Sequence, residues 1–170
     1  MNKKVEKTVL SALFLTLGMI LPLLTAQIKE IGDSLLPMHF AVLLCGMVCG
    51  PRYGLAVGLI LPFFRSAIFS MPPIYPNAVW MSLELATYGY VAGIIYTKSQ
   101  KTLVWIYVSL ISAMVTGRVV WGVTKALLLG LAGNAFTPVA FILGGFVDAL
   151  PGIILQLILI PLIVKRRKAR

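Results

Sequence analysis

The chain is a succession of long apolar runs separated by short breaks that are polar or rich in proline and glycine. A helix that crosses the hydrocarbon core of a bilayer needs about 20 mostly apolar residues. The pattern predicts six membrane helices, at residues 6–26, 35–48, 52–70, 78–96, 103–131 and 137–164, of which 35–48 is short. We expect the whole chain, residues 1–170, to form a single transmembrane domain.

The breaks are as informative as the runs. Gly50-Pro51 separates the second run from the third, because proline suits the first turn of a new helix. Three prolines between Met71 and Asn77 predict a stiff loop, after which Asn77 is placed to cap the next helix. Gly133-Asn134 ends the fifth run.

Composition then fixes the class. Of the 170 residues 59% are hydrophobic and only 12% are charged, which is too little polar surface for a water-soluble domain of this size. The sequence therefore predicts an all-α membrane protein, a six-transmembrane-helix bundle crossing a bacterial-type plasma membrane several times. Its surroundings are the lipid bilayer, and no length remains for a separate catalytic or nucleotide-binding domain.

The formal net charge of +10 is distributed in a way that predicts orientation. Most Lys and Arg residues lie at the ends of the predicted helices, which argues against a nucleic-acid partner. If the N-terminus is cytoplasmic, nearly all the loop cations lie inside and only Lys29 lies outside. The positive-inside rule thus predicts that both termini are cytoplasmic.

Five ionisable residues fall within the predicted spans: Arg65, Glu84, Arg118, Lys125 and Asp148. A charge at that depth costs about 2.5–3.5 kcal/mol on insertion scales, so each should face the protein interior and have a partner or a function. Counting residues along each helix places all five between the bilayer midplane and the outer surface.

Two helix faces combine these charges with aromatic side chains at three- and four-residue spacing. Such faces are typical of a small-molecule pocket, which the proline-rich loop and the Lys29–Asp33 loop would cover from outside. The substrate-binding candidates are Arg65, Tyr75, Asn77, Trp80, Glu84, Tyr88, Arg118, Trp121, Lys125 and Asp148.

Internal pairing is the alternative use of these charges. Arg118 would pair with Asp148, and Arg65 or Lys125 with Glu84. Three cations facing two anions leave one positive charge over, which favours a ligand with a carboxylate or another acceptor-rich group. His39, the only histidine, is expected at a helix start or at the membrane interface, and a contact with the ligand is the less favoured option.

No motif for enzymatic chemistry is present. The sequence contains no HExxH, no G-x-S-x-G and no phosphate-binding loop, so we expect neither an enzyme nor ATP hydrolysis by this chain alone. No metal and no cofactor is expected. Cys45 and Cys49 lie four residues apart in an apolar helix, where small residues favour close packing.

The first helix carries no charge at membrane depth. It has instead a ridge of small residues at four-residue spacing, Thr8, Ala12 and Thr16. Small residues let another helix approach closely. Two interpretations stay open: packing within the same bundle, or docking of a second membrane protein.

Together these features resemble the substrate-binding S component of energy-coupling factor (ECF) vitamin transporters. The resemblance covers nearly the whole chain and rests on its size, the six helices and three stretches of sequence. The first is the small-residue ridge of the first predicted helix, which departs from the family's A-x-x-x-A pattern by having threonine on both sides of Ala12. The second is residues 36–54. The third is residues 71–89, from Met71-Pro72-Pro73 to Glu84-Leu85-Ala86-Thr87-Tyr88-Gly89.

The resemblance implies high-affinity capture of a B-group vitamin or similar micronutrient, pantothenate above all, with riboflavin and folate as other options. It implies a membrane coupling protein and two ATPase subunits as partners, whose ATP hydrolysis makes the S component topple in the membrane. The alternative function is that of an ion-coupled secondary transporter for a small organic solute, with Glu84 or Asp148 as proton relay.

Overall fold

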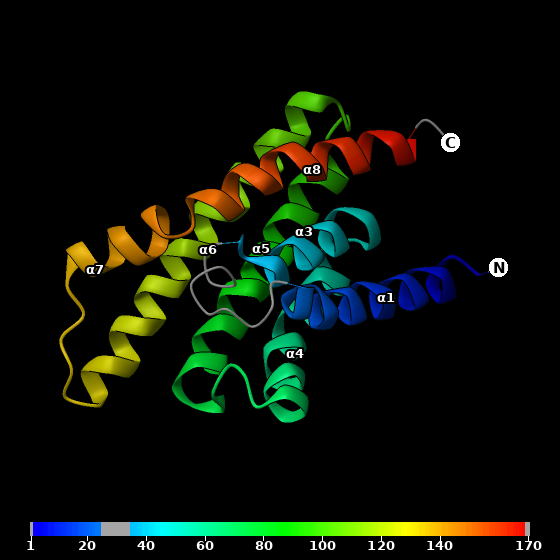
Figure 1. Cartoon of the computed structure of the whole chain (residues 1–170). Helices are drawn as coiled ribbons and strands as arrows, with labels where there is room; N and C mark the ends of the chain where they lie inside the picture. Colours follow the sequence, from blue (N-terminus) through cyan, green and yellow to red (C-terminus); the bar gives the residue numbers. More distant parts are fainter. Residues whose placement is uncertain (1, 25–34, 169–170) are drawn as a thin grey trace.

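A computed structural model describes residues 2–24 and 35–168 (Figure 1). This part of the chain is all-α, which confirms the predicted fold class. Its elements are α1 (Lys3–Leu24), α3 (Pro37–Cys49), α4 (Pro51–Phe69), η1 (Ile74–Ala78), α5 (Val79–Lys98), α6 (Leu103–Leu131), α7 (Pro138–Ile142), η2 (Leu143–Val147) and α8 (Leu150–Lys168). Among the described residues, five apolar segments are long enough to cross a membrane, and α3 is a shorter sixth helix.

The last span differs from the continuous helix expected over residues 137–164. It is split into α7, the wide turn η2 and α8, and the amide of Asp148 donates to the carbonyl of Leu143 five residues earlier, at 2.9 Å. Gly144 and Gly145 favour such an interruption because glycine is a weak helix former. Pro151 fits the first turn of α8, where its missing N–H costs no hydrogen bond.

The short helix α3 lies in the middle of the bundle. It is apolar on all sides, and every residue from Ala41 to Met47 is buried. A helix with no polar face is expected to be surrounded by protein or lipid. Here it packs against α1, α4 and α5, so its burial provides much of the apolar core.

Glycines bring α3, α4 and α5 into backbone contact. A Cβ atom on Gly89 of α5 would overlap the backbone of Gly54 on α4, and one on Gly46 of α3 would overlap the carbonyl of Gly89. Small residues allow this approach between membrane helices, where dispersion contacts replace the hydrophobic effect as the source of association. These three helices therefore form a close-packed scaffold, on which α6 lies against α5.

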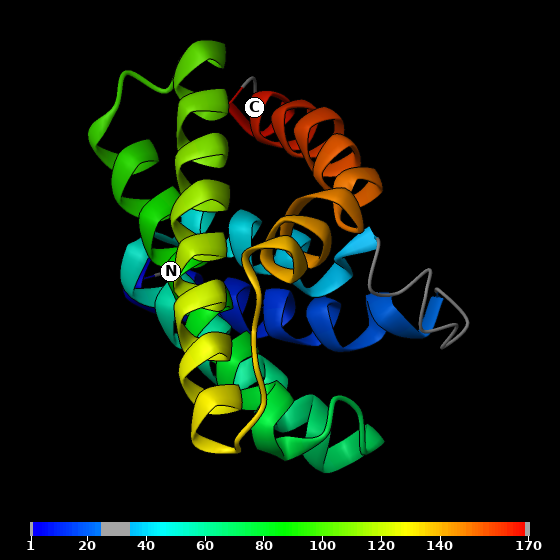
Figure 2. The ribbon, with the colours of Figure 1, turned by 90° about the vertical axis from the view of Figure 1, so that its left-hand side faces the viewer.

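The remaining span lies over this scaffold. The main contacts of α8 with the rest of the bundle are to α3 and α6, and α7 and α8 run along one side of the molecule (Figures 1 and 2). The buried side chain of Gln156 ties α8 to the start of α3, because its Nε2 donates to the carbonyl of Leu36 at 3.2 Å.

The start of α1, the end of α8 and the turn between α5 and α6 lie towards one side of the molecule, and the segment after α6 lies towards the other (Figure 1). The cytoplasmic placement of the first side stays a prediction. The expected loop Lys29–Asp33 and residues 25–26 of the first predicted helix lie outside the described residues.

Candidate functional site

Four side chains from three helices form what we call the buried polar cluster: His39 of α3, Glu84 and Tyr88 of α5, and Arg118 of α6. All four are buried, and Glu84 is only 2% exposed. Arg118 Nη1 donates to Glu84 Oε1 at 2.8 Å, and His39 Nε2 lies 3.2 Å from the same oxygen. The ring of Tyr88 meets the imidazole of His39 edge-on at 4.9 Å.

This arrangement corrects the expected charge pairing. Arg118 was expected to pair with Asp148, and Glu84 with Arg65 or Lys125, but the ion pair joins Glu84 to Arg118. The reason is tertiary, because α5 and α6 pack side by side while Asp148 lies exposed at the break before α8. Within residues 2–24 and 35–168, Asp148 has no ion pair.

The buried polar cluster has more hydrogen-bonding capacity than the described residues use. Arg118 Nε and Nη2, the Tyr88 hydroxyl and both ring nitrogens of His39 are buried and have no hydrogen-bond partner in the described part of the chain. Leaving a buried donor unsatisfied costs about 1–3 kcal/mol. Such groups are therefore candidates for contact with a bound molecule or with water.

A second group, which we call the aromatic–lysine cluster, lies beside the first. Lys125 Nζ is 5.3 Å from the ring centroid of Trp80, 4.6 Å from that of Trp121 and 5.4 Å from that of Phe136. An ammonium within about 6 Å of a ring face is attracted by the ring's quadrupole. The guanidinium of Arg118 lies 5.8 Å from the Trp121 ring, so the two clusters are continuous.

Six of the ten predicted site residues thus come together. Glu84, Tyr88 and Arg118 belong to the buried polar cluster, and Trp80, Trp121 and Lys125 to the aromatic–lysine cluster. They come from α5 and α6, and Trp121 further packs against Gly144 and Gly145 of η2.

Arg65 does not belong to these clusters. It is buried, its Nη1 donates to the carbonyl of Met19 in α1 at 3.0 Å, and its guanidinium lies 5.5 Å from the Phe69 ring. These contacts connect α4 to α1, which is a structural use of the charge.

Two candidates lie in the proline-rich segment before α5. Tyr75 is 62% exposed and Asn77 is half-buried. As expected, the segment is not helical throughout, because Tyr75 within η1 has an extended backbone. The expected capping by Asn77 is wrong, since the residue at the cap position of α5 is Ala78, without a side-chain bond. The Ser66 hydroxyl donates to the carbonyl of Pro72 and ties this segment to α4.

Two pockets lie near the ends of α6. One, of about 420 Å³, is apolar and includes Phe136 of the aromatic–lysine cluster; it is lined by Val119, Gly122, Val123, Ala126, Phe136, Thr137, Pro138 and Phe141. The other, of about 190 Å³, lies at the opposite end of α6. None of the ten predicted residues lines either pocket, and of the two loops expected to cover the site, Lys29–Asp33 lies outside the described residues.

Sequence reasoning missed Phe136 as a neighbour of the site and gave a ligand contact for His39 only as the less favoured option. His39 does lie near the start of its helix, as expected, and it is 3% exposed with its Nε2 3.2 Å from Glu84. The available signal was that α3 is apolar on all sides, because a lone polar side chain on a surrounded helix must face protein. Phe136 follows α6 in an irregular segment, where no periodicity indicates direction.

The ridge on α1 faces away from the bundle. Thr8, Ala12 and Thr16 are all exposed, and the two threonine hydroxyls donate to carbonyls within the helix, Thr8 to Lys4 and Thr16 to Ala12, each at 3.0 Å. The opposite face, including Ser11 and Gly18, packs on the protein. The first interpretation, in which the ridge packs within its own bundle, is therefore wrong.

The family of the chain follows from its similarity to known proteins. Residues 6–164 match the family model for the ECF transporter, substrate-specific component. No curated protein and no solved structure matches the chain. Since the matched region covers nearly all of the 170 residues, the chain belongs to the family of substrate-specific components of ECF transporters, and it is accordingly a multi-pass transporter subunit of the plasma membrane and not an enzyme.

Proposed function

We propose that this S component captures an anionic B-group vitamin, pantothenate in the first place. The observation that carries the proposal is the juxtaposition of two cations, Arg118 and Lys125, with the faces of Trp80 and Trp121 on neighbouring helices. Cationic donors bind a carboxylate by charge-assisted hydrogen bonds, and aromatic faces cover the apolar part of a small ligand.

The two cations have different roles in this proposal. Lys125 is half-buried and its ammonium is oriented by three rings, so it is the group that would meet the carboxylate of the vitamin. Arg118 already donates one hydrogen bond to Glu84, and its remaining Nε–H and Nη2–H groups would donate to hydroxyl or amide oxygens of the ligand. Glu84 holds Arg118 in place.

Uptake in this proposal depends on a coupling protein in the membrane and on two ATPase subunits. The chain itself has no phosphate-binding loop. The exposed ridge of Thr8, Ala12 and Thr16 is the proposed docking surface for the coupling protein, because small side chains allow close approach of a partner helix.

A pair of matched ligands tests the substrate. Calorimetry on the purified protein should show tight binding of pantothenate and binding of panthenol, in which an alcohol replaces the carboxylate, weaker by about 1.5–3 kcal/mol. Equal binding of the two would remove the carboxylate from recognition. Absence of pantothenate binding, with riboflavin or folate bound instead, would overturn the choice of vitamin.

A variant tests the assigned role of Lys125. Lys125→Met keeps most of the length of the side chain and removes its charge, so we expect it to lose affinity for pantothenate and not for panthenol. Thermal unfolding of the same preparation controls for damage to the fold. A loss that is equal for both ligands would assign Lys125 to packing.

Energisation is tested in reconstituted vesicles. We expect uptake of radiolabelled pantothenate only when the coupling protein, both ATPases and ATP are present. Uptake by the isolated chain under a proton gradient would contradict the proposal and favour an ion-coupled carrier.

A further inference from the structure

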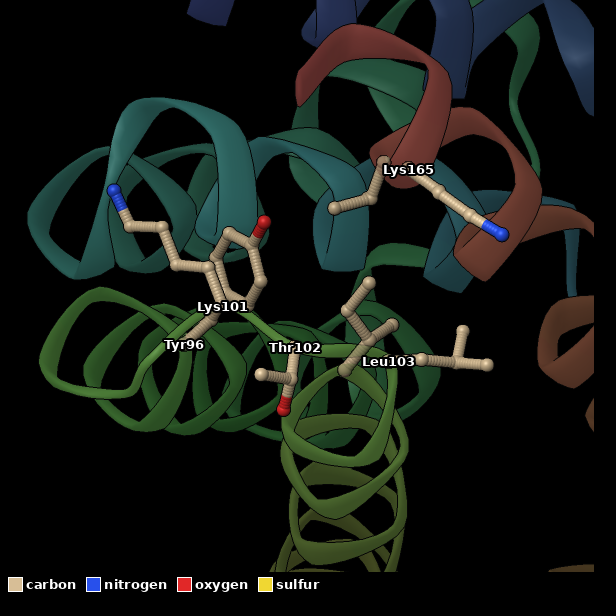
Figure 3. Close-up of a pocket in the computed structure, with 7 residues that line it drawn as sticks. Tyr96, Lys101, Thr102, Leu103 and Lys165 are labelled. Carbon is tan, nitrogen blue, oxygen red and sulfur yellow. The ribbon is translucent and has the colours of Figure 1, made fainter. Parts of the chain in front are cut away.

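The pocket between the first turn of α6 and the last turns of α8 has a chemistry that vitamin capture does not use. It has a volume of about 190 Å³ and is lined by Tyr96, Lys101, Thr102, Leu103, Ile106, Val164 and Lys165 (Figure 3). Its inner wall is apolar, since Ile106 and Val164 are buried core residues, and Lys101 and Lys165 are exposed at its rim.

The position of the pocket relative to the bilayer follows from the spans. One candidate span begins at Leu103 and another ends at Arg166, so we expect both helices to leave the hydrocarbon core near the pocket. The apolar wall therefore faces the acyl region, while the two lysines are at the level of the lipid headgroups. This side of the protein is the one predicted to be cytoplasmic, where anionic lipids attract basic residues.

Local backbone features favour an anion at the same place. The cap position of α6, Thr102, makes no side-chain hydrogen bond to the first turn, so the positive end of the helix is not compensated by a cap. Lys101, at the rim of the pocket, has φ of +55°, a left-handed conformation that residues with a Cβ rarely adopt. In Figure 3 the side chains of Lys101 and Lys165 extend to either side of the opening.

We infer that this pocket binds an anionic phospholipid of the membrane leaflet it faces. The phosphate lies between Lys101 and Lys165 near the start of α6, and the beginning of an acyl chain lies against Leu103, Ile106 and Val164. Both lysine side chains are exposed and long, so their ammonium groups turn towards the phosphate without movement of the helices. The bound lipid joins the α5–α6 turn to the end of α8.

Native mass spectrometry of the full chain, titrated with phosphatidylglycerol or phosphatidylcholine in detergent, tests the inference. We expect one phosphatidylglycerol to be retained and phosphatidylcholine not to be. The double variant K101Q/K165Q should weaken this retention by roughly tenfold or more, because two charge-assisted contacts are lost. The matched double variant K98Q/R166Q removes two exposed charges beside the pocket and should change phosphatidylglycerol retention by less than about threefold.

A filling variant separates the lipid from a soluble anion. Leu103→Trp adds bulk at the exposed edge of the pocket and leaves both lysines, so it should reduce phosphatidylglycerol retention while the melting temperature is unchanged. Equal effects of the two double variants would overturn the inference in favour of diffuse surface charge.

Two further outcomes would also overturn it. Displacement of phosphatidylglycerol by an equal concentration of glycerol phosphate would mean that the pocket selects a soluble phosphate. Unchanged lipid retention in K101Q/K165Q together with loss of assembly with the coupling protein would mean that a protein occupies the site.

Discussion

At the scale of single residues, Glu84 shows how a charge can be kept inside a membrane bundle. Its side chain is 2% exposed, and one carboxylate oxygen accepts a hydrogen bond from Arg118 and lies 3.2 Å from His39 Nε2. An unpaired charge at this depth would be strongly unfavourable, whereas a hydrogen-bonded pair offsets much of the cost of desolvation. Glu84 and Arg118 therefore depend on each other.

A double-variant cycle tests this dependence. Arg118→Met should destabilise the protein by about 3–5 kcal/mol, because it leaves the carboxylate of Glu84 buried without its main partner. Adding Glu84→Gln should restore most of that stability, since the amide is neutral and leaves no buried charge without a partner. Unfolding in mixed micelles measures both steps. If the double variant is no more stable than Arg118→Met, the pair does not hold the two residues in place.

At the scale of elements, the contact of α3, α4 and α5 depends on glycine. Gly46, Gly54 and Gly89 meet backbone to backbone, where no side chain fits. The same triple contact positions α5, and with it Trp80, Glu84 and the rest of its inward face. A site on α5 is precise only while these helices keep their spacing.

Two glycine-to-alanine substitutions distinguish the effect of this close packing from that of helix propensity. Gly89→Ala should destabilise the protein by about 1–3 kcal/mol or more, because its methyl group would overlap the backbone of Gly54. Gly130→Ala in α6, where no atom lies within 4 Å of the added carbon, should instead stabilise slightly, by about 0.5–1 kcal/mol. Thermal unfolding compares them. A harmless Gly89→Ala would disprove the close contact.

The exposed face of α1 is the second element with a testable role. Ala12→Leu should leave vitamin affinity unchanged but impair copurification with the coupling protein, because the larger side chain keeps a partner helix away. Ala56→Leu is a matched control, the same change on an exposed position of α4. Normal assembly of Ala12→Leu, or equal loss in both variants, would remove the proposed docking surface.

At the scale of the whole molecule, charge distribution and helix order predict one orientation. The α5–α6 turn and the end of α8 carry Lys98, Lys101, Lys165 and Arg166, and they lie towards the same side (Figure 1). The segment after α6, at the other side, has no Lys or Arg from Ala132 to Thr137. The positive-inside rule places the basic side in the cytoplasm.

Labelling of single cysteines checks this orientation. We expect a membrane-impermeant maleimide to modify Asn134→Cys in intact cells, and Ser99→Cys only after the membrane is opened. The native Cys45 and Cys49 are buried and should give little background. Labelling of Ser99→Cys in intact cells would reverse the predicted topology.

The lengths of apolar runs were sufficient to predict an all-helical membrane protein, because backbone groups in lipid must be satisfied within each segment. Spacing along α5 and α6 was also sufficient to group Trp80 with Glu84 and Trp121 with Lys125, because a helix repeats every 3.6 residues. These are local properties, and neither depends on how the helices meet.

Only the tertiary structure decided which helices meet. It paired Arg118 with Glu84 instead of Asp148, brought His39 from α3 to the same carboxylate, and turned Arg65 towards α1. Periodicity gives the face of each helix but not its neighbour. In this bundle the neighbours are set by non-local contacts such as that of Gly46 with Gly89, which no single helix encodes.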